Sequence, residues 1–140
     1  MSCITKEEYK ILKHEKLQDL GRGNCPFCAL ETQKERILWK GEFLYVVEAL
    51  SPYIQSNKHL LVIPYDHKKY TYELSKKEFW ELYEVELFMK WFYGEEEYFS
   101  FIRETMWKRS IEHLHYHFLP WIVRWSKIGE MLELQGYIKN

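Results

Sequence analysis

The stretch SIEHLHYHFLP, residues 110–120, constrains the fold of this chain more than any other. It places His113, His115 and His117 at alternate positions, and these are half of the six histidines in the sequence. Side chains on a β-strand point alternately to its two faces, so a strand here would turn all three imidazoles to one side, with neighbours about 6.6–7 Å apart. The apolar residues between them would face the core. We therefore predict a strand with one imidazole face and one buried face.

Length and composition are typical of a single globular domain spanning 1–140. The 140 residues are 46% hydrophobic and 18% aromatic, which is enough to fill one core. The formal net charge of −1 provides no basic surface for binding a polyanion through bulk charge. Nucleic acid is therefore not expected as a partner, and any contact with a nucleotide must be local.

The sequence shows no signal for secretion or membrane insertion. Its start, MSCITKEEYKILKHEK, has no long apolar run after a basic segment, and no stretch approaches the ~20 apolar residues of a membrane span. We expect a cytoplasmic protein with no membrane partner. In such a reducing compartment the three cysteines do not suggest a disulfide framework.

The order of the expected elements defines the fold class. In chain order, the expected elements are a helix in 1–20, a short helical stretch near 28–36, a β-hairpin broken at Gly41, a strand at 59–64, a long helix at 76–93, strands at 98–104 and 113–119, and a C-terminal helix at 126–140. Ser75 and Glu78 form a capping-box pattern at the start of the long helix. Short turns join most of the strands. We predict an α+β domain with a mostly antiparallel five-stranded sheet, one long helix and terminal helices.

The long helix is expected to bury a wide apolar face. Its apolar residues recur at helical spacing and include Phe79, Leu82, Val85, Met89 and Phe92.

Cys25 and Cys28 form a C-x-x-C pair, which suits a metal ion better than a structural disulfide. A closed tetrahedral zinc site needs two further ligands, and the candidates are His14, His59, His67 and the three alternating histidines. A redox pair or two buried thiols are the alternatives. A zinc centre made by all three alternating histidines is disfavoured, because the outer two would lie about 13 Å apart at Cα on a strand.

Two elements together resemble the histidine triad (HIT) superfamily of nucleotidyl hydrolases and transferases. They are NKHLLVIPYDHKKYTYELS, residues 57–75, and the triad stretch itself, and the resemblance covers about 22–121. It is closest to the zinc-bearing branch. Carried onto this sequence, it implies a structural Zn²⁺ held by Cys25, Cys28, His67 and His113. Residues 1–20 and 126–140 lie outside the resemblance and are candidates for family-specific helices or for the surface of a homodimer.

The resemblance also implies a mechanism at the α-phosphate of a nucleotide. His115 would be the nucleophile that forms a covalent nucleotidyl-histidine, with its other ring nitrogen held by an acceptor such as a backbone carbonyl. His117 would help to bind the phosphate and pass a proton to the leaving group. A histidine at this third position favours a hydrolase acting on diadenosine polyphosphates or other nucleoside phosphate conjugates. Ser110, with Lys108 and Arg109 before it, would contact the phosphates.

The sequence departs from the family pattern where substrate contacts are made. The nearest acid to the usual ribose-binding position is Glu48, and Arg103 or Thr105 could replace the polar residues that usually line the phosphate pocket. Trp107 or Tyr53 could stack on a base. Two other hypotheses remain: a zinc-stabilised module that binds nucleotides or RNA without turnover, and a protein interaction scaffold that uses the helix at 76–93.

Overall fold

The computed structural model describes residues 25–105 and 111–136. Its elements are η1 (Leu30–Thr32), η2 (Lys34–Arg36), β1 (Ile37–Lys40), β2 (Leu44–Glu48), β3 (Leu60–Pro64), η3 (Thr71–Glu73), α2 (Lys76–Tyr93), β4 (Tyr98–Ile102), β5 (Tyr116–Pro120) and α3 (Trp125–Leu134). The short helix expected near 28–36 is the pair of 3₁₀ turns η1 and η2. The helix expected in 1–20 lies outside the described residues.

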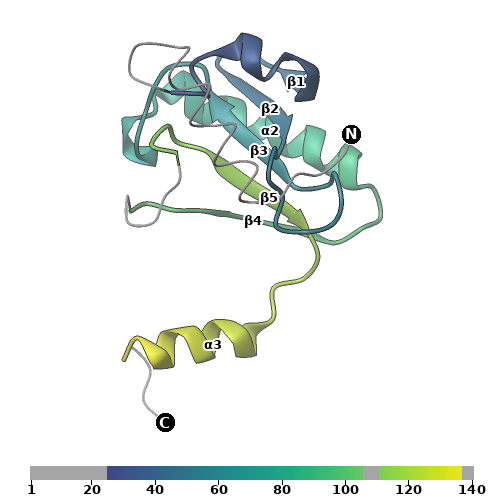
Figure 1. Cartoon of the computed structure of the whole chain (residues 1–140), viewed down its shortest axis with the longest axis vertical. Coiled ribbons are helices and arrows are strands. Elements are labelled where there is room, and N and C mark those ends of the chain that lie inside the picture. The colour runs from purple at the N-terminus through teal and green to yellow at the C-terminus, as the bar shows by residue number, and fades with distance from the viewer. Residues whose placement is uncertain (1–24, 106–110, 137–140) are drawn as a thin grey trace.

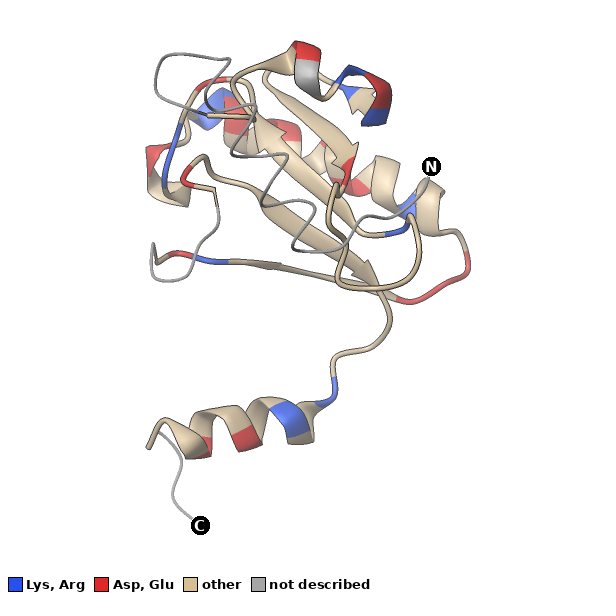
Figure 2. Cartoon of the chain, in the orientation of Figure 1, with Lys and Arg blue, Asp and Glu red and all other residues tan. Residues whose placement is uncertain are grey.

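The five strands form one sheet in the order β1-β2-β3-β5-β4, and every neighbouring pair is antiparallel (Figure 1). The predicted α+β class is confirmed. β1 and β2 form the expected hairpin at Gly41, whose N–H donates to the carbonyl of Leu44 at 2.8 Å. β3 lies at the centre of the sheet and all five of its residues are buried. Neither β3 nor β5 carries a charged side chain, whereas the surrounding turns carry charges of both signs (Figure 2).

The sheet has two differently used faces. One face packs against α2 and is formed by Leu44, Val46, Leu60, Val62 and Phe118. The other face carries Tyr45, Val47, Leu61 and Ile63, which pack with Cys25, Phe27 and Ile111. Both faces are therefore covered, one by a helix and the other by the segment that contains the C-x-x-C pair.

α2 begins with the predicted capping box. The Ser75 side chain accepts from the Glu78 N–H at 3.1 Å, and the Glu78 carboxylate accepts from the Ser75 N–H at 2.8 Å. Val85 and Met89 are fully buried against the sheet, and Leu82 and Phe92 pack beside them. The expectation for Phe79 was wrong, since it is 54% exposed. The apolar periodicity of this helix is broader than the face that the sheet covers.

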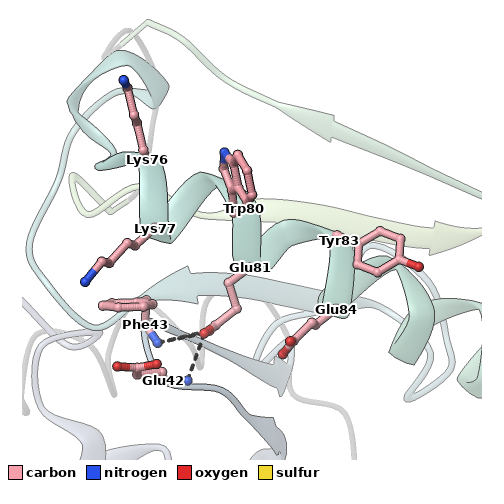
Figure 3. A pocket seen from close by; sticks show the side chains of 8 residues that line it. All are labelled: Glu42, Phe43, Lys76, Lys77, Trp80, Glu81, Tyr83 and Glu84. Carbon is pink, nitrogen blue, oxygen red and sulfur yellow. Dashed lines mark hydrogen bonds between the residues drawn. The ribbon is translucent and has the colours of Figure 1, made fainter.

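The β1–β2 turn is tied to α2 by one carboxylate. Glu81 accepts the backbone N–H groups of Glu42, Phe43 and Leu44 at 2.8–3.2 Å (Figure 3). Gly41 has to lack a Cβ, because a Cβ there would overlap the Glu81 side chain. The glycine in the middle of the hairpin is thus explained by close approach of a helix side chain.

The triad stretch is a strand only in its second half. β5 begins at Tyr116, so of the three histidines only His117 lies in the sheet, paired with Leu61 and Phe101. The strand prediction for His113 and His115 was wrong. Before Tyr116 the chain leaves the sheet, and the Leu114 N–H donates to the carbonyl of Lys68 at 2.6 Å instead. Tyr116 and Phe118 still face α2, as the alternation predicted.

A C-terminal helix was predicted at 126–140, and α3 (Trp125–Leu134) begins one residue before that range and ends within it. It stands away from the sheet at the end of an extended segment, residues 121–124 (Figure 1). Across the described parts of the chain, no helix combines the length and apolar character needed to cross a bilayer.

Candidate functional site

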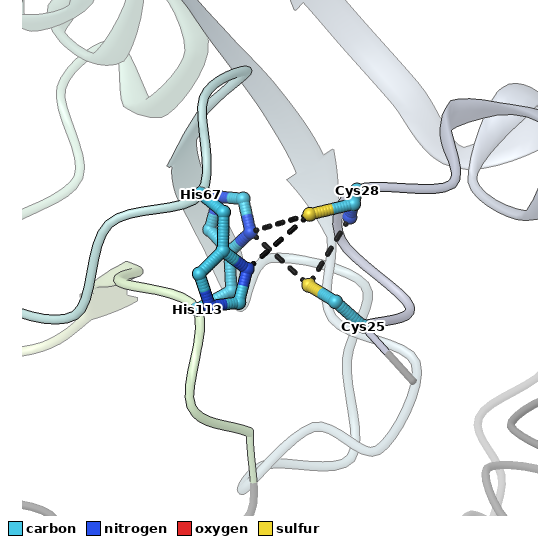
Figure 4. A group of neighbouring side chains, drawn as sticks. All are labelled: Cys25, Cys28, His67 and His113. Carbon is cyan, nitrogen blue, oxygen red and sulfur yellow. Dashed lines mark hydrogen bonds between the residues drawn. The ribbon is translucent and has the colours of Figure 1, made fainter. Parts of the chain in front are cut away.

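Four side chains that are distant in sequence meet on the sheet face opposite α2. Cys25 and Cys28 come from the turn before η1, His67 follows β3, and His113 precedes β5 (Figure 4). One ligand atom from each lies within 4.8 Å of all the others. The four residues implied by the family resemblance are therefore brought together, and neither His59 nor His115 is part of the cluster.

The spacing of these atoms suits a tetrahedral zinc ion. Zinc bonds of 2.3 Å to sulfur and 2.0–2.1 Å to nitrogen give tetrahedron edges of about 3.3–3.8 Å. The Cys28 Sγ lies 3.3 Å from the His67 Nδ1 and 3.4 Å from the His113 Nδ1, and the Cys25 Sγ lies 3.1 Å from the His113 Nδ1. Two thiolates and two imidazoles form a donor set that zinc prefers. The cluster can hold a metal ion such as zinc.

Both histidines of the cluster are oriented by a second contact. The His113 Nε2 lies 2.7 Å from the carbonyl oxygen of Pro64, which can only accept, so this nitrogen carries the proton and Nδ1 keeps its lone pair towards the cysteines. The His67 Nε2 lies 3.3 Å from the Glu112 carboxylate, and this contact lowers the pKa of Glu112. Such outer partners fix the ring and the tautomer of metal-binding histidines.

His115 follows the cluster and is oriented by the backbone. Its Nδ1 lies 2.9 Å from the carbonyl oxygen of His113, so Nδ1 donates a proton and, in the neutral ring, the lone pair is on Nε2. The ring lies edge-on to Phe27, with centroids 5.2 Å apart. His113, which supplies this carbonyl, is also the most buried residue of the cluster. Metal binding and the orientation of His115 are therefore coupled through the same residue.

His117 belongs to a chain of hydrogen bonds that fixes its tautomer. The Tyr53 backbone N–H donates to the His59 Nδ1 at 3.2 Å, so a neutral His59 carries its proton on Nε2. That nitrogen lies 3.0 Å from the His117 Nδ1 and donates to it. The proton of a neutral His117 is consequently on Nε2. His117 offers an N–H donor on the side of the ring away from His59.

The surroundings of His117 are aromatic and dry. Its ring is parallel to that of Phe101, with centroids 4.5 Å apart, and stacks on Tyr53 at 5.4 Å. Burial lowers the pKa of His117 to about 2, and the positive charges of His115, His59 and Arg103 contribute. Burial likewise lowers the pKa of His59 to about 4. The pair is neutral at physiological pH and acts through hydrogen bonds rather than charge.

The predicted substrate contacts have different outcomes. Arg103, directly after β4, lies close enough to His117 to affect its pKa. Glu48 pairs with Leu60 on β3, and Leu60 pairs with Phe118 on β5. Leu60 and Phe118 face α2, so Glu48 occupies a position on the α2 face of the sheet and not on the face of the histidines. The structure therefore does not bring Glu48 to this site. Ala49, the next residue, packs on the histidine side.

Three of the predicted phosphate contacts, Lys108, Arg109 and Ser110, lie outside the described residues, as does Trp107. Sequence reasoning gave His59 no role beyond that of one candidate metal ligand among several, and it missed Glu112 and Phe101 altogether. The position of His59 directly before β3 was a usable signal, because strands were expected at both 59–64 and 113–119.

Comparison with known proteins places the fold. No family model and no curated protein matches the chain. Solved structures do match it. A histidine triad protein from Clostridium difficile has a TM-score of 0.56 at 19% identity, covering 74% of this chain and 95% of that chain. A HIT family hydrolase from Clostridium thermocellum has a TM-score of 0.57 at 21% identity, covering 71% and 92%.

A third match is the Plasmodium falciparum diadenosine triphosphate hydrolase, with a TM-score of 0.55 at 17% identity, covering 74% of this chain and 76% of that chain. At these identities the matches establish the fold and not the reaction. The chain has the fold of the histidine triad superfamily. Its cluster of two cysteines and two histidines adds a candidate zinc site to that fold.

Proposed function

We propose that the chain is a nucleotide hydrolase or nucleotidyl transferase that acts at the α-phosphate, with His115 as the nucleophile. The observation that carries the proposal is the hydrogen bond from the His115 Nδ1 to the His113 carbonyl oxygen at 2.9 Å. It makes Nε2 the nucleophilic nitrogen of a neutral imidazole, which is the form that attacks phosphorus.

The first step forms a bond between the His115 Nε2 and the α-phosphorus and breaks the bond to the leaving phosphate, which departs with the electron pair. In the second step water or another acceptor attacks the same phosphorus and loses its proton to the solvent, and the P–N bond breaks with its electron pair returning to the His115 Nε2. A phosphate leaving group needs no proton near neutral pH. The neutral His117, with its Nε2 proton, would donate a hydrogen bond to a phosphate oxygen, and the nearby Arg103 would offset developing negative charge.

Zn²⁺, bound by Cys25, Cys28, His67 and His113, would supply structural cross-linking in this scheme. The protein's own contribution is to hold the segment before β5 out of the sheet, through the contacts of His113 with Pro64 and of Leu114 with Lys68. That displacement sets where the His113 carbonyl, and with it the ring of His115, is placed.

Diadenosine polyphosphates, whose leaving group is a phosphate, are the substrate class to test first. Purified protein should release AMP from at least one of them, whereas His115→Ala should release none while keeping its melting temperature and metal content. A full rate in His115→Ala would refute the proposal.

One observation favours a second candidate, a zinc-stabilised module that binds nucleotides or RNA without turnover. His117 is only 5% exposed between Phe101 and Tyr53, a setting better suited to stacking than to proton transfer. Saturable nucleotide binding that is equal in the wild type and His115→Ala, with no product from any nucleotide, would establish that candidate instead.

A further inference from the structure

Phe27 lies between the two cysteines of the cluster, in a turn that the rest of the domain holds in place. Its side chain is buried on the sheet face opposite α2. Its carbonyl oxygen accepts from the Tyr45 hydroxyl at 2.7 Å, and the carbonyl oxygen of Pro26 beside it accepts from the Gln33 side chain at 3.3 Å. Burial raises the pKa of Tyr45, so the hydroxyl keeps its proton and remains a donor. The position of the Phe27 ring is therefore fixed by the domain as well as by the cysteines on either side.

The ring of Phe27 lies against two imidazoles. Its centroid is 5.2 Å from that of His115, with an angle of 74° between the ring planes. The corresponding values for His113 are 6.0 Å and 80°. Both contacts are edge-to-face, which aromatic rings favour because the ring edge is positive and the face is negative. Phe27 thus contacts one histidine of the metal cluster and also the histidine that is the proposed nucleophile.

The hydrogen bond of His115 fixes one point of its ring and leaves the tilt of the ring open. The Nδ1 is held 2.9 Å from the carbonyl oxygen of His113, but the ring can still rotate about this contact. A rotation of about 30° moves Nε2 by about 1 Å, and a misplacement of this size can lower a reaction rate about 100-fold. His117 contacts the ring from within the same stretch of chain, with centroids 4.8 Å apart. Phe27 adds a restraint that comes from a distant and separately anchored segment.

We propose that Phe27 is a positioning residue for His115, and that its ring sets the tilt of the imidazole and hence the direction of Nε2. This inference rests on the proposed function, because it assigns a role within that reaction. It gives the C-x-x-C turn a second task, since the segment that carries both cysteines also carries the ring that restrains the nucleophile. The metal cluster and the nucleophile are then joined by two routes, the carbonyl group of His113 and the ring of Phe27.

A role of Phe27 in packing alone predicts a different result. Because Phe27 is buried, any smaller side chain there lowers the melting temperature, whatever happens to His115. Val85 offers a matched control, since it is fully buried on the α2 face of the sheet, away from the histidines. Val85→Ala therefore reports the effect of lost packing by itself.

The first test is steady-state kinetics of the zinc-loaded full chain with a diadenosine polyphosphate. Phe27→Leu keeps a large apolar side chain, so it should keep its zinc and lower kcat about tenfold, with KM changed less than about twofold. Phe27→Ala should lower kcat about 100-fold. Val85→Ala should lower the melting temperature at least as much as Phe27→Leu and leave kcat unchanged.

Three kinetic results would overturn the proposal. They are a wild-type kcat in zinc-loaded Phe27→Leu, an equal loss of kcat in Val85→Ala, and loss of zinc from Phe27→Leu, since the effect would then act through the metal site.

Nuclear magnetic resonance of His115 tests the placement of the ring without relying on activity. In zinc-loaded protein with isotope-labelled histidine, the neutral His115 ring of the wild type should carry its proton on Nδ1 alone, and its signal is assigned by its absence in His115→Ala. Phe27→Leu should show a mixture of the two tautomers, because a tilted ring weakens the hydrogen bond to the His113 carbonyl, whereas Val85→Ala should match the wild type.

The two measurements separate failure of this inference from failure of the proposed function. If the wild type turns over no nucleotide, the proposed reaction fails and the resonance comparison still decides whether Phe27 places the ring. A His115 ring that stays protonated on Nδ1 alone in Phe27→Leu would overturn the positioning role, whether or not the protein is an enzyme.

Discussion

Replacing Cys28 with serine should separate the metal site from the rest of the fold. Cys28 contributes two of the three close contacts between sulfur and nitrogen in the cluster, 3.3 Å to the His67 Nδ1 and 3.4 Å to the His113 Nδ1. The side chain is exposed and belongs to neither core cluster, so the substitution removes a ligand without opening a cavity. Its effect on stability should therefore act through the metal.

The magnitude follows from linkage between binding and folding. If losing one of four ligands weakens zinc binding about a thousandfold, the metal-linked stabilisation falls by about 4 kcal/mol at a fixed zinc concentration. For a domain of this size that corresponds to a fall in melting temperature of about 10 °C or more. Elemental analysis should find one zinc per chain in the wild type and in Cys3→Ser, and much less in Cys28→Ser.

Thermal unfolding with and without a chelator completes the assay. Chelation should lower the melting temperature of the wild type towards that of Cys28→Ser and change that of Cys28→Ser little. An unchanged melting temperature of the chelated wild type, or loss of metal from Cys3→Ser, would refute the reasoning.

Three further outcomes are expected. Glu81→Ala leaves the backbone N–H groups of Glu42, Phe43 and Leu44 without their acceptor and should cost about 3 kcal/mol in urea unfolding, whereas Glu84→Ala should cost little; equal costs would contradict the account. His59→Phe should lower kcat/KM about tenfold, and His59→Gln, which can accept from Tyr53 and donate to His117, should recover most of it. His59 is protonated near pH 6.5 in the unfolded state but only near pH 4 in the folded state. The contribution of neutral His59 to the free energy of unfolding, on the order of 2–3 kcal/mol, is therefore present above pH 6.5 and lost as the pH falls to 4. Stability curves should show that loss, and its size should shrink in His59→Gln; a curve that is flat across this range would contradict it.

The motifs were sufficient to predict the sheet, and the four cluster residues followed from the family resemblance. The C-x-x-C pair alone left all six histidines as candidate ligands, and the resemblance selected His67 and His113. The hairpin at Gly41 and the capped helix from Lys76 were also readable, because each depends on a few neighbouring residues.

The errors arose where contacts between distant segments decide the local structure. Alternation alone predicts a strand through His113 and His115, but the Leu114 N–H bonds to the Lys68 carbonyl and the His113 ring to the Pro64 carbonyl, so this segment does not extend the backbone pairing of β5 with β3. β2 reads LYVVE, with four apolar residues in a row, so its pattern could not say which face Glu48 takes. The register with β3 decided it. The role of His59 depends on which side chain lies opposite it, which no local pattern contains.

The most direct test of the proposed reaction is to trap its intermediate. The protein should be mixed with a substrate that yields AMP, quenched within the first turnover under mildly basic conditions, and digested for mass spectrometry. The account predicts an acid-labile adenylyl group on the peptide that contains His115, present in the wild type and absent in His115→Ala. An adenylyl group on another residue, or AMP released at the full rate by His115→Ala, would contradict it.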